Sequence, residues 1–160
     1  RDGKEGLLTV EKEKPDLIIY PHELDGNPTH IKTSHLINEA LTKFGSDLSL
    51  LTAKTEYWHP MTNPNLLLEG SIVDVSDLMI ALTYHAGEVI RNPYHLSLPA
   101  WMIDNVRRGS EMMGTYGGAI TNFDYGTIYK IQKWSNGEFL AALETPAMVS
   151  KDGFVLDLLK

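Results

Sequence analysis

The chain has 160 residues and a mass of 17.9 kDa, and 42% of its residues are hydrophobic while 22% are charged. This composition is typical of a globular domain that buries a core without a metal or disulfide staple. The absence of cysteine excludes a disulfide scaffold, a cysteine-based zinc ribbon and a thiol nucleophile. The net charge of -7 opposes binding to nucleic acid or anionic lipid, and every apolar run is far shorter than a membrane span. We therefore expect neither nucleic acid nor a membrane as a partner.

The start of the chain carries two further expectations. Its first residues, Arg1–Glu5, are polar and contain no apolar signal region, which favours a cytoplasmic protein. A chain that begins with Arg instead of Met is typical of a fragment or a processed product. We treat 1–160 as a single domain with a core over about 7–143 and a tail over 144–160.

The first predicted elements are a strand and a helix. Pro15–Tyr20 is a compact apolar run behind a proline, which is typical of a parallel, central strand buried on both faces. Asn27 and Pro28 predict the start of a helix, because Asn is a favoured N-cap and Pro suits the first helical position. Apolar residues at helical spacing extend this helix to Phe44, and Gly45 stands where a C-cap glycine belongs.

A second group of elements follows in the middle of the chain. We expect a strand over Leu48–Ala53 and a short strand within Leu66–Val75. Asp74 or Ser76 is the expected cap of the next helix, which carries His85.

The last predicted elements are a helix and a hairpin. The helix is expected over about Pro99–Met113. The alternating segment Gly126–Trp134 predicts a strand, and Asn136–Gly137 is a strong turn signal before Glu138–Leu140. Together the elements predict an α/β fold, Rossmann-like, with a mostly parallel sheet, flanking helices and a C-terminal β-hairpin.

The loop after the first strand concentrates polar side chains. In open parallel sheets, ligands bind at the carboxyl ends of strands, next to the N-terminus of the following helix. In the alternative interpretation Asn27 only caps the helix, Asp25 only forms an Asx turn and the histidines lie on the surface. The polar residues of the segment are His22, Glu23, Asp25, Asn27, Thr29 and His30.

Several short segments succeed one another in a specific order. They are Pro15–Tyr20, Asp25–His30, Thr33, Ala40–Leu41, Pro64–Leu67, Val73–Ser76, Ala81–Leu82, His85 and Arg108–Gly109. In this order they resemble the LmbE-like (PIG-L type) zinc N-deacetylases, over about Val10–Phe123. The segments His22–His30 and Arg91–Trp101 are similar to a subgroup in which this domain follows a glucosamine-6-phosphate deaminase-like domain.

The resemblance implies a zinc hydrolase that removes the acetyl group from an N-acetylglucosamine-type amino sugar or its conjugate. In such an enzyme a zinc-bound water attacks the amide carbonyl, which the metal polarises. The second motif of the family usually reads His-Pro-Asp-His, and its last histidine, a zinc ligand, falls on His30. Its first histidine, which stabilises the oxyanion, falls on Asn27, and its aspartate falls on Thr29. A side-chain amide can still donate to an oxyanion, but it cannot carry a proton as imidazolium does.

The first motif of the family has no counterpart in this chain. That motif, His-Pro-Asp-Asp-Glu, supplies two zinc ligands and the general base, whereas the one His-Pro pair here, His59–Pro60, is followed by no carboxylates. A catalytic zinc generally takes three protein ligands. We therefore expect the N-terminal strands that carry the motif to be missing, and the chain to need that missing half, or another chain, for activity. Whether it also forms a homo-oligomer stays open.

Three residues beyond the loop are candidates through the same resemblance. His85 is a candidate catalytic residue, with a satisfied, partly buried histidine as the alternative. Tyr94 and Arg108, together with Asp25, are candidates for binding substrate, since aromatic faces suit sugar rings and arginine suits phosphate. Core packing for the tyrosine and a solvated helix face for the arginine are the alternatives.

Two other functions remain open. One is a non-catalytic amino-sugar-binding or regulatory module, which Asn27 and Thr29 favour because they replace the motif's histidine and aspartate. The other is a structural half that completes a larger assembly.

Overall fold

The structure, a computed structural model, describes residues 10, 12–114 and 120–159. These residues divide into two compact units. The first unit contains the described residues up to Asn65, together with Tyr129–Thr145 and residue 159. The second unit contains the described residues of Leu66–Ile128, together with Pro146–Leu158.

The sheet of the first unit has the order β1-β2-β4-β5. β1 (Leu17–Pro21) pairs in parallel with β2 (Leu50–Thr55). β2 pairs antiparallel with β4 (Tyr125–Ser135), of which the residues from Tyr129 onward belong to this unit. β4 continues through the predicted hairpin into β5 (Glu138–Ala141).

The hairpin turn is formed by Asn136 and Gly137, as the sequence predicts. Their φ angles are 54° and 82°, so both lie in the left-handed region. Asn and Gly are the residues that adopt this conformation at least cost, and two successive positive φ angles match the right-handed twist of the flanking strands. This turn sets the register in which β5 pairs with β4.

The prediction that the first strand is central, and buried on both faces, is wrong. β1 is the edge strand of the first unit. Leu17 and Ile19 are 43% and 58% exposed, while Tyr20 on the other face is buried. An apolar run fits an edge strand with one packed face as well as a central strand, because the run itself does not specify its neighbours.

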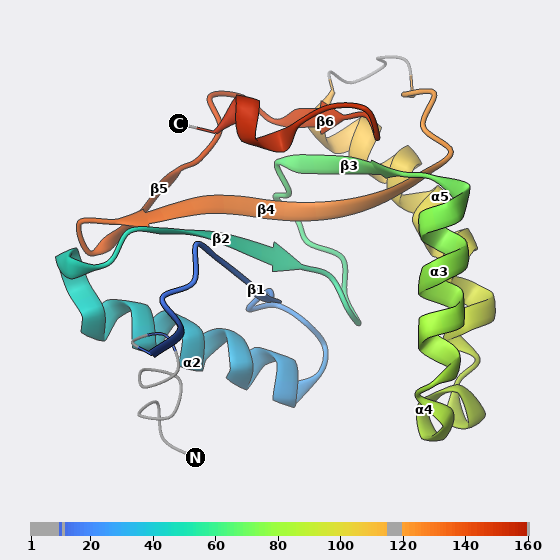
Figure 1. The fold of residues 1–160 in the computed structure, drawn as a ribbon, viewed down its shortest axis with the longest axis horizontal. Helices are drawn as coiled ribbons and strands as arrows, with labels where there is room; N and C mark the ends of the chain where they lie inside the picture. The colour runs from blue at the N-terminus through green and yellow to red at the C-terminus, as the bar shows by residue number, and fades with distance from the viewer. Residues whose placement is uncertain (1–9, 11, 115–119, 160) are drawn as a thin grey trace. The chain divides into compact units, whose positions relative to one another are not determined.

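Helix α2 (Pro28–Phe44) begins and ends as predicted. The Asn27 side chain accepts a hydrogen bond of 2.8 Å from the Thr29 N–H, and Gly45, with φ of 60°, ends the helix. A 3-10 turn, η1 (Gly45–Asp47), leads on to β2. The helix lies along the sheet of the first unit (Figure 1) and packs Leu41 against two buried side chains of the sheet.

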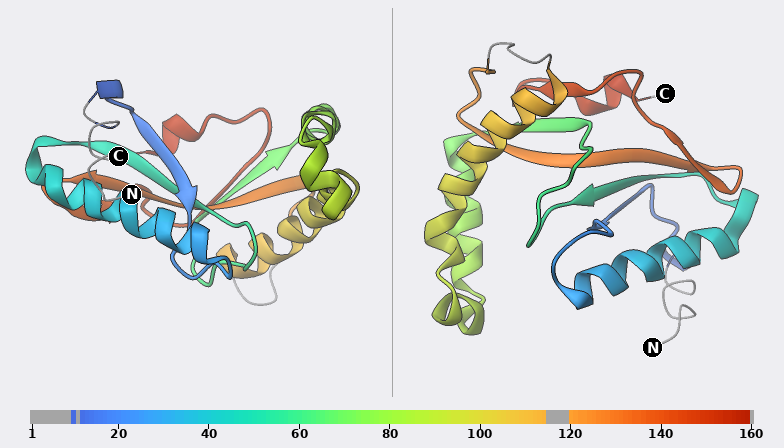
Figure 2. Two further views of the ribbon diagram at one scale, coloured as in Figure 1. Left: turned by 90° about the horizontal axis from the view of Figure 1, so that it is seen from below. Right: turned by 180° about the vertical axis from the view of Figure 1, so that it is seen from behind.

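The second unit combines a small sheet with three helices. In the strand order β3 lies between β4 and β6, and β3 pairs in parallel with β6. Figure 2 shows α3 and α5 side by side, with α4 at one end of the pair. The elements are β3 (Leu66–Gly70), α3 (Ile72–Thr83), α4 (Ala86–Arg91), α5 (Tyr94–Met113), β6 (Ala147–Val149) and a 3-10 turn, η2 (Val155–Leu158).

Two helix boundaries in the second unit differ from the prediction. Ser71, not Asp74 or Ser76, caps α3, and Asp74 completes a capping box with it. His85 lies beyond the end of α3, at the entry to α4. α5 begins at Tyr94 and includes Pro99; the sequence prediction used the wrong one of two nearby prolines as the helix start.

The core of the second unit forms where α5 crosses β3. Leu67 on β3 is fully buried, and its methyl groups lie against Gly109 of α5 and Gly126 of β4. A Cβ atom at Gly109 would stand 3.0 Å from Leu67 Cδ2. The two glycines therefore allow the helix and the strand to approach the leucine closely.

The predicted fold class is confirmed. The chain is an α/β protein with flanking helices and a C-terminal hairpin, which is compatible with a Rossmann-like fold. The pairs β1–β2 and β3–β6 are parallel, while β4 runs antiparallel to β2 and β5. β6 is the one strand that the prediction left in the tail. Among the described residues, no helix combines the length and the apolar character that crossing a bilayer requires.

Candidate functional site

The first unit brings two loops together at the carboxyl ends of its parallel strands, which we call the carboxyl edge of the sheet. β1 ends at Pro21 and the parallel strand β2 ends at Thr55, so the loops that follow, 22–27 and 56–65, leave the same edge. This is the edge at which ligands bind in open α/β sheets. Each of the sequence candidates in the segment 22–30 lies here.

Asp25 is the residue that joins the two loops. It is 1% exposed, and its carboxylate accepts hydrogen bonds of 2.9 Å from the Asn27 N–H and 2.8 Å from the Trp58 N–H. The first bond is the Asx turn that the alternative interpretation expects, and the second fixes the loop after β2. The same carboxylate accepts a further bond of 2.9 Å from Nδ1 of His30.

These contacts keep Asp25 ionised. Burial by itself would raise the pKa of the Asp25 carboxyl. The hydrogen bonds from Trp58, Asn27 and His30, and the attraction of the imidazole, outweigh burial and hold that pKa below its ordinary value. The N-terminus of α2, with its partial positive charge, adjoins the same position. A buried anion therefore stands between the two loops.

The ionised Asp25 determines the tautomer of His30. A carboxylate can only accept, so Nδ1 of His30 carries the hydrogen in the 2.9 Å bond. In the neutral ring Nε2 then has a free lone pair. The His30 side chain is 23% exposed, and its ring lies 4.8 Å from the ring of Tyr57. The arrangement suits a ring that binds a metal or exchanges a proton through Nε2.

His22 has the opposite tautomer and a structural role. Its ring is buried, and Nδ1 accepts a hydrogen bond of 3.3 Å from the Leu24 N–H. Nε2 therefore carries the hydrogen and donates it to the His59 carbonyl oxygen at 2.8 Å. Both ring nitrogens of His22 are occupied within the protein, so His22 has no lone pair to offer a metal.

Asn27 is the helix cap that the alternative interpretation predicts. Its Oδ1 accepts from the Thr29 N–H at 2.8 Å, which satisfies one of the N–H groups that a helix start leaves without a partner. The cap occupies the oxygen of the amide and leaves the nitrogen as its donor. An oxyanion contact from Asn27 would therefore come from Nδ2.

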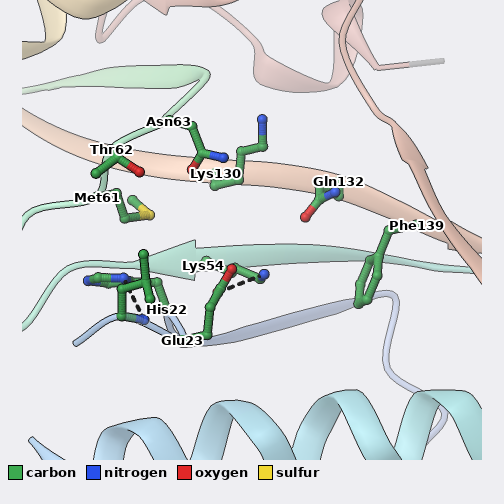
Figure 3. Close-up of a pocket in the computed structure, with 10 residues that line it drawn as sticks. His22, Glu23, Lys54, Met61, Thr62, Asn63, Lys130, Gln132 and Phe139 are labelled. Carbon is green, nitrogen blue, oxygen red and sulfur yellow. Dashed lines mark hydrogen bonds and ion pairs between the residues drawn. The ribbon is translucent and has the colours of Figure 1, made fainter.

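A pocket of about 220 Å³ opens beside this edge. Figure 3 shows Glu23 and Lys54 on one side of it and Lys130 and Asn63 on the other. Most of its lining is polar. The residues that line it are His22, Glu23, Leu24, Lys54, Met61, Thr62, Asn63, Lys130, Gln132 and Phe139.

The ion pair of the pocket joins Glu23 and Lys54. The Lys54 Nζ donates to Glu23 Oε2 at 2.8 Å and stands 5.7 Å from the centre of the Phe139 ring. Partial burial would raise the pKa of Glu23, but the hydrogen bond from Lys54 and the positive charge of Lys54 lower it on balance. Glu23 is therefore an anion at neutral pH and balances one lysine.

The remaining candidates belong to the second unit. His85 is exposed at the entry to α4, so the interpretation as a partly buried residue is wrong. Tyr94 is half-buried, and its hydroxyl accepts from Asn92 Nδ2 at 3.1 Å. Arg108 donates to Asn105 Oδ1 at 2.7 Å and pairs with Asp104 at 3.3 Å on the same helix. These three residues belong to the second unit, whereas Asp25 and His30 belong to the first.

Among residues 10, 12–114 and 120–159, no group of three or more His, Asp or Glu side chains is arranged to hold a metal ion. Comparison of the sequence with protein-family models and with curated proteins, and of the fold with solved structures, finds no match.

Sequence reasoning named His22 and Glu23 but missed the other polar residues that line the pocket, and it missed the backbone contact that connects the loops. Trp58 contributes a backbone N–H, which no side-chain pattern reveals. Lys54 and Lys130 lie within strands, and only the register of β2 with β4 shows that they are opposite each other.

Proposed function

We propose that the chain is part of a zinc-dependent N-deacetylase that acts on an N-acetylglucosamine-type amino sugar, and that His30 Nε2 is one of its zinc ligands. The observation that supports the proposal is the 2.9 Å bond between His30 Nδ1 and the buried carboxylate of Asp25. Metal-bound histidines usually donate their other ring N–H to such a carboxylate, which fixes the ring and raises its basicity. We keep the cytoplasm as the proposed location.

The residues of the described chain fit one position of a zinc site. His30 supplies a nitrogen ligand, and Asp25 holds its ring in place. The other ligands would come from outside the described residues or from another chain, since a catalytic zinc generally takes three. Zinc, when bound, polarises the amide carbonyl and lowers the pKa of water.

The protein residues then have separate roles in the proposed reaction. Asp25 positions His30 and stays ionised, because two backbone N–H groups stabilise its charge. Asn27 Nδ2 is the proposed donor to the oxyanion that forms when water adds to the amide carbonyl. Its position as the N-cap of α2 ties that donor to the helix that carries His30.

The test measures zinc content and deacetylation on the full product of the gene. N-acetylglucosamine is the probe substrate, and the free amine that it releases is measured. We expect about one zinc per chain, which His30→Ala abolishes together with activity. His35→Ala is the matched control, since His35 is an exposed histidine on the same helix, and it should change neither.

Two results would oppose the proposal. Full zinc content in the His30→Ala variant would remove His30 from the ligand set. Binding of the amino sugar without zinc and without release of amine would instead identify the non-catalytic binding module.

A further inference from the structure

The pocket of the first unit places two lysines opposite each other. Lys54 on β2 and Lys130 on β4 are direct partners in the antiparallel register, and both line the pocket. Like charges at directly opposite positions of a sheet destabilise it. The pair therefore costs stability unless negative charge lies between or beside the two ammonium groups.

The protein supplies negative charge to only one of the two lysines. Glu23 pairs with Lys54 at 2.8 Å, and the Lys54 side chain is 12% exposed. Lys130 has no carboxylate partner among the described residues. The His22 ring bonds to the Leu24 N–H and to the His59 carbonyl oxygen, and an imidazole offers Lys130 no negative charge. The pocket thus keeps an unbalanced positive charge within a chain of net charge -7.

The rest of the lining suits a small polar molecule. Thr62, Asn63 and Gln132 place a hydroxyl and two amide groups around the pocket, and Phe139 forms an apolar wall. The volume of about 220 Å³ is below the range of about 300 to 1,000 Å³ that is typical of sites for drug-sized ligands. A molecule of monosaccharide size, or a smaller one, fits these limits.

We propose that this pocket binds a small molecule through an oxyanion group, a phosphate or a carboxylate, with Lys130 as its principal cation and Lys54 as the second. The amide and hydroxyl groups of Gln132, Asn63 and Thr62 complete the hydrogen bonds of the anion. This inference goes beyond the proposed hydrolysis, because it rests on the lysines of β2 and β4 and involves neither His30 nor zinc.

Calorimetric titration of the chain with inorganic phosphate, and separately with acetate, at constant ionic strength tests the proposal. We expect saturable binding of at least one of the two anions. Lys130→Gln should weaken it about tenfold, as expected for the loss of one charge-assisted bond. Lys133→Gln is the matched control: Lys133 lies on the same strand, but alternation turns it to the other face of the sheet. Binding in this control should be unchanged.

A second variant gives an effect of opposite sign. Glu23→Gln removes the carboxylate that engages Lys54, so it should tighten anion binding several-fold. Preference for phosphate or for acetate identifies which anion the site recognises. The proposal is overturned if neither anion shows saturable binding, if Lys133→Gln weakens binding as much as Lys130→Gln, or if Glu23→Gln weakens it. These titrations do not depend on zinc. A negative result would therefore reject the anion site and would not bear on His30 as a zinc ligand.

Discussion

The backbone N–H of Trp58 donates a hydrogen bond of 2.8 Å to Oδ2 of Asp25, so a buried carboxylate from the loop after β1 anchors the loop after β2. The other oxygen of Asp25 accepts from Asn27 and from His30. One side chain thereby fixes two loops and the orientation of an imidazole. The stability and the chemistry of this edge depend on the same charge.

Replacing Asp25 should destabilise the first unit in a pH-dependent way. Asp25→Asn keeps the shape of the side chain but turns an amide donor toward N–H groups, so we expect a loss of about 1 to 3 kcal/mol at neutral pH. The pKa of Asp25 is lowered in the folded chain, so its contribution is complete above the unfolded pKa of about 4 and disappears as the pH falls through the lower, folded value.

Denaturant unfolding of both proteins between neutral pH and about pH 3 measures this difference. The difference in free energy of unfolding between wild type and Asp25→Asn should become smaller as the pH falls below about 4. Asp47→Asn, at an exposed position of η1, is the control and should leave stability unchanged. A gap that stays constant with pH would contradict the assigned charge of Asp25.

The two histidines of the site should respond differently to truncation. His22→Ala removes a buried ring and leaves the Leu24 N–H and the His59 carbonyl without their partner, so we expect a loss of about 2 kcal/mol or more. His30 is partly exposed, and its removal should cost less. Thermal and denaturant unfolding of the two variants compares them, and an equal or larger loss for His30→Ala would contradict the structural role of His22.

Tyr20 should resist ionisation in the folded protein. Burial, reinforced by the charge of Glu23, raises the pKa of its hydroxyl, which donates to Asn38 Oδ1 at 3.1 Å. The unfolded chain ionises this group near pH 10 while the folded chain does not, so the free energy of unfolding should decrease above about pH 10. Tyr20→Phe should remove that part of the decrease. Because Tyr20 stays protonated in the folded chain, wild type and Tyr20→Phe should show equal phenolate absorbance at about pH 11. A clearly lower absorbance in the variant would show that Tyr20 does ionise and would refute the prediction.

Gly109 and Gly87 should respond to alanine with opposite signs. A Cβ at Gly109 would stand 3.0 Å from Leu67, so Gly109→Ala should cost about 1 to 3 kcal/mol through overpacking, more than the helix gains. Nothing lies within 4 Å of a Cβ at Gly87 in α4, and Gly87→Ala should gain about 0.5 kcal/mol. Unfolding by denaturant measures both, and a stabilised Gly109→Ala would show that α5 does not pack tightly on Leu67.

Local signals in the sequence predict those elements whose boundaries are set by neighbouring residues. Asn27, Pro28 and Gly45 define α2 because a cap, a first-turn proline and a left-handed glycine act within one turn of the helix. Asn136 and Gly137 define the hairpin for the same reason. Ser71 was missed as a cap because Asp74 and Ser76 have the same capping chemistry; in the structure Ser71 is the N-cap and Asp74 is its capping-box partner.

Features that depend on distant residues could not be predicted in this way. The edge position of β1 follows from the strand order, which the run Leu17–Pro21 does not contain. The pocket combines residues from both loops with residues of β2, β4 and β5. Of the candidate site, the sequence identified Asp25, Asn27 and His30 but not the bond between the first and the last, because that bond depends on how the Asx turn folds back.

The most direct test of the site is the tautomer of each histidine, measured by nitrogen-15 NMR of the imidazole rings at about pH 8, where ordinary histidines are neutral. The structure predicts hydrogen on Nδ1 of His30, which faces Asp25, and hydrogen on Nε2 of His22, which faces the His59 carbonyl. Asp25→Asn should release His30 from its tautomer and leave that of His22 unchanged. Hydrogen on Nε2 of His30 in the wild-type chain would contradict the account, because the lone pair would then lie on Nδ1, against the Asp25 carboxylate, and Nε2 would have none to present to a metal.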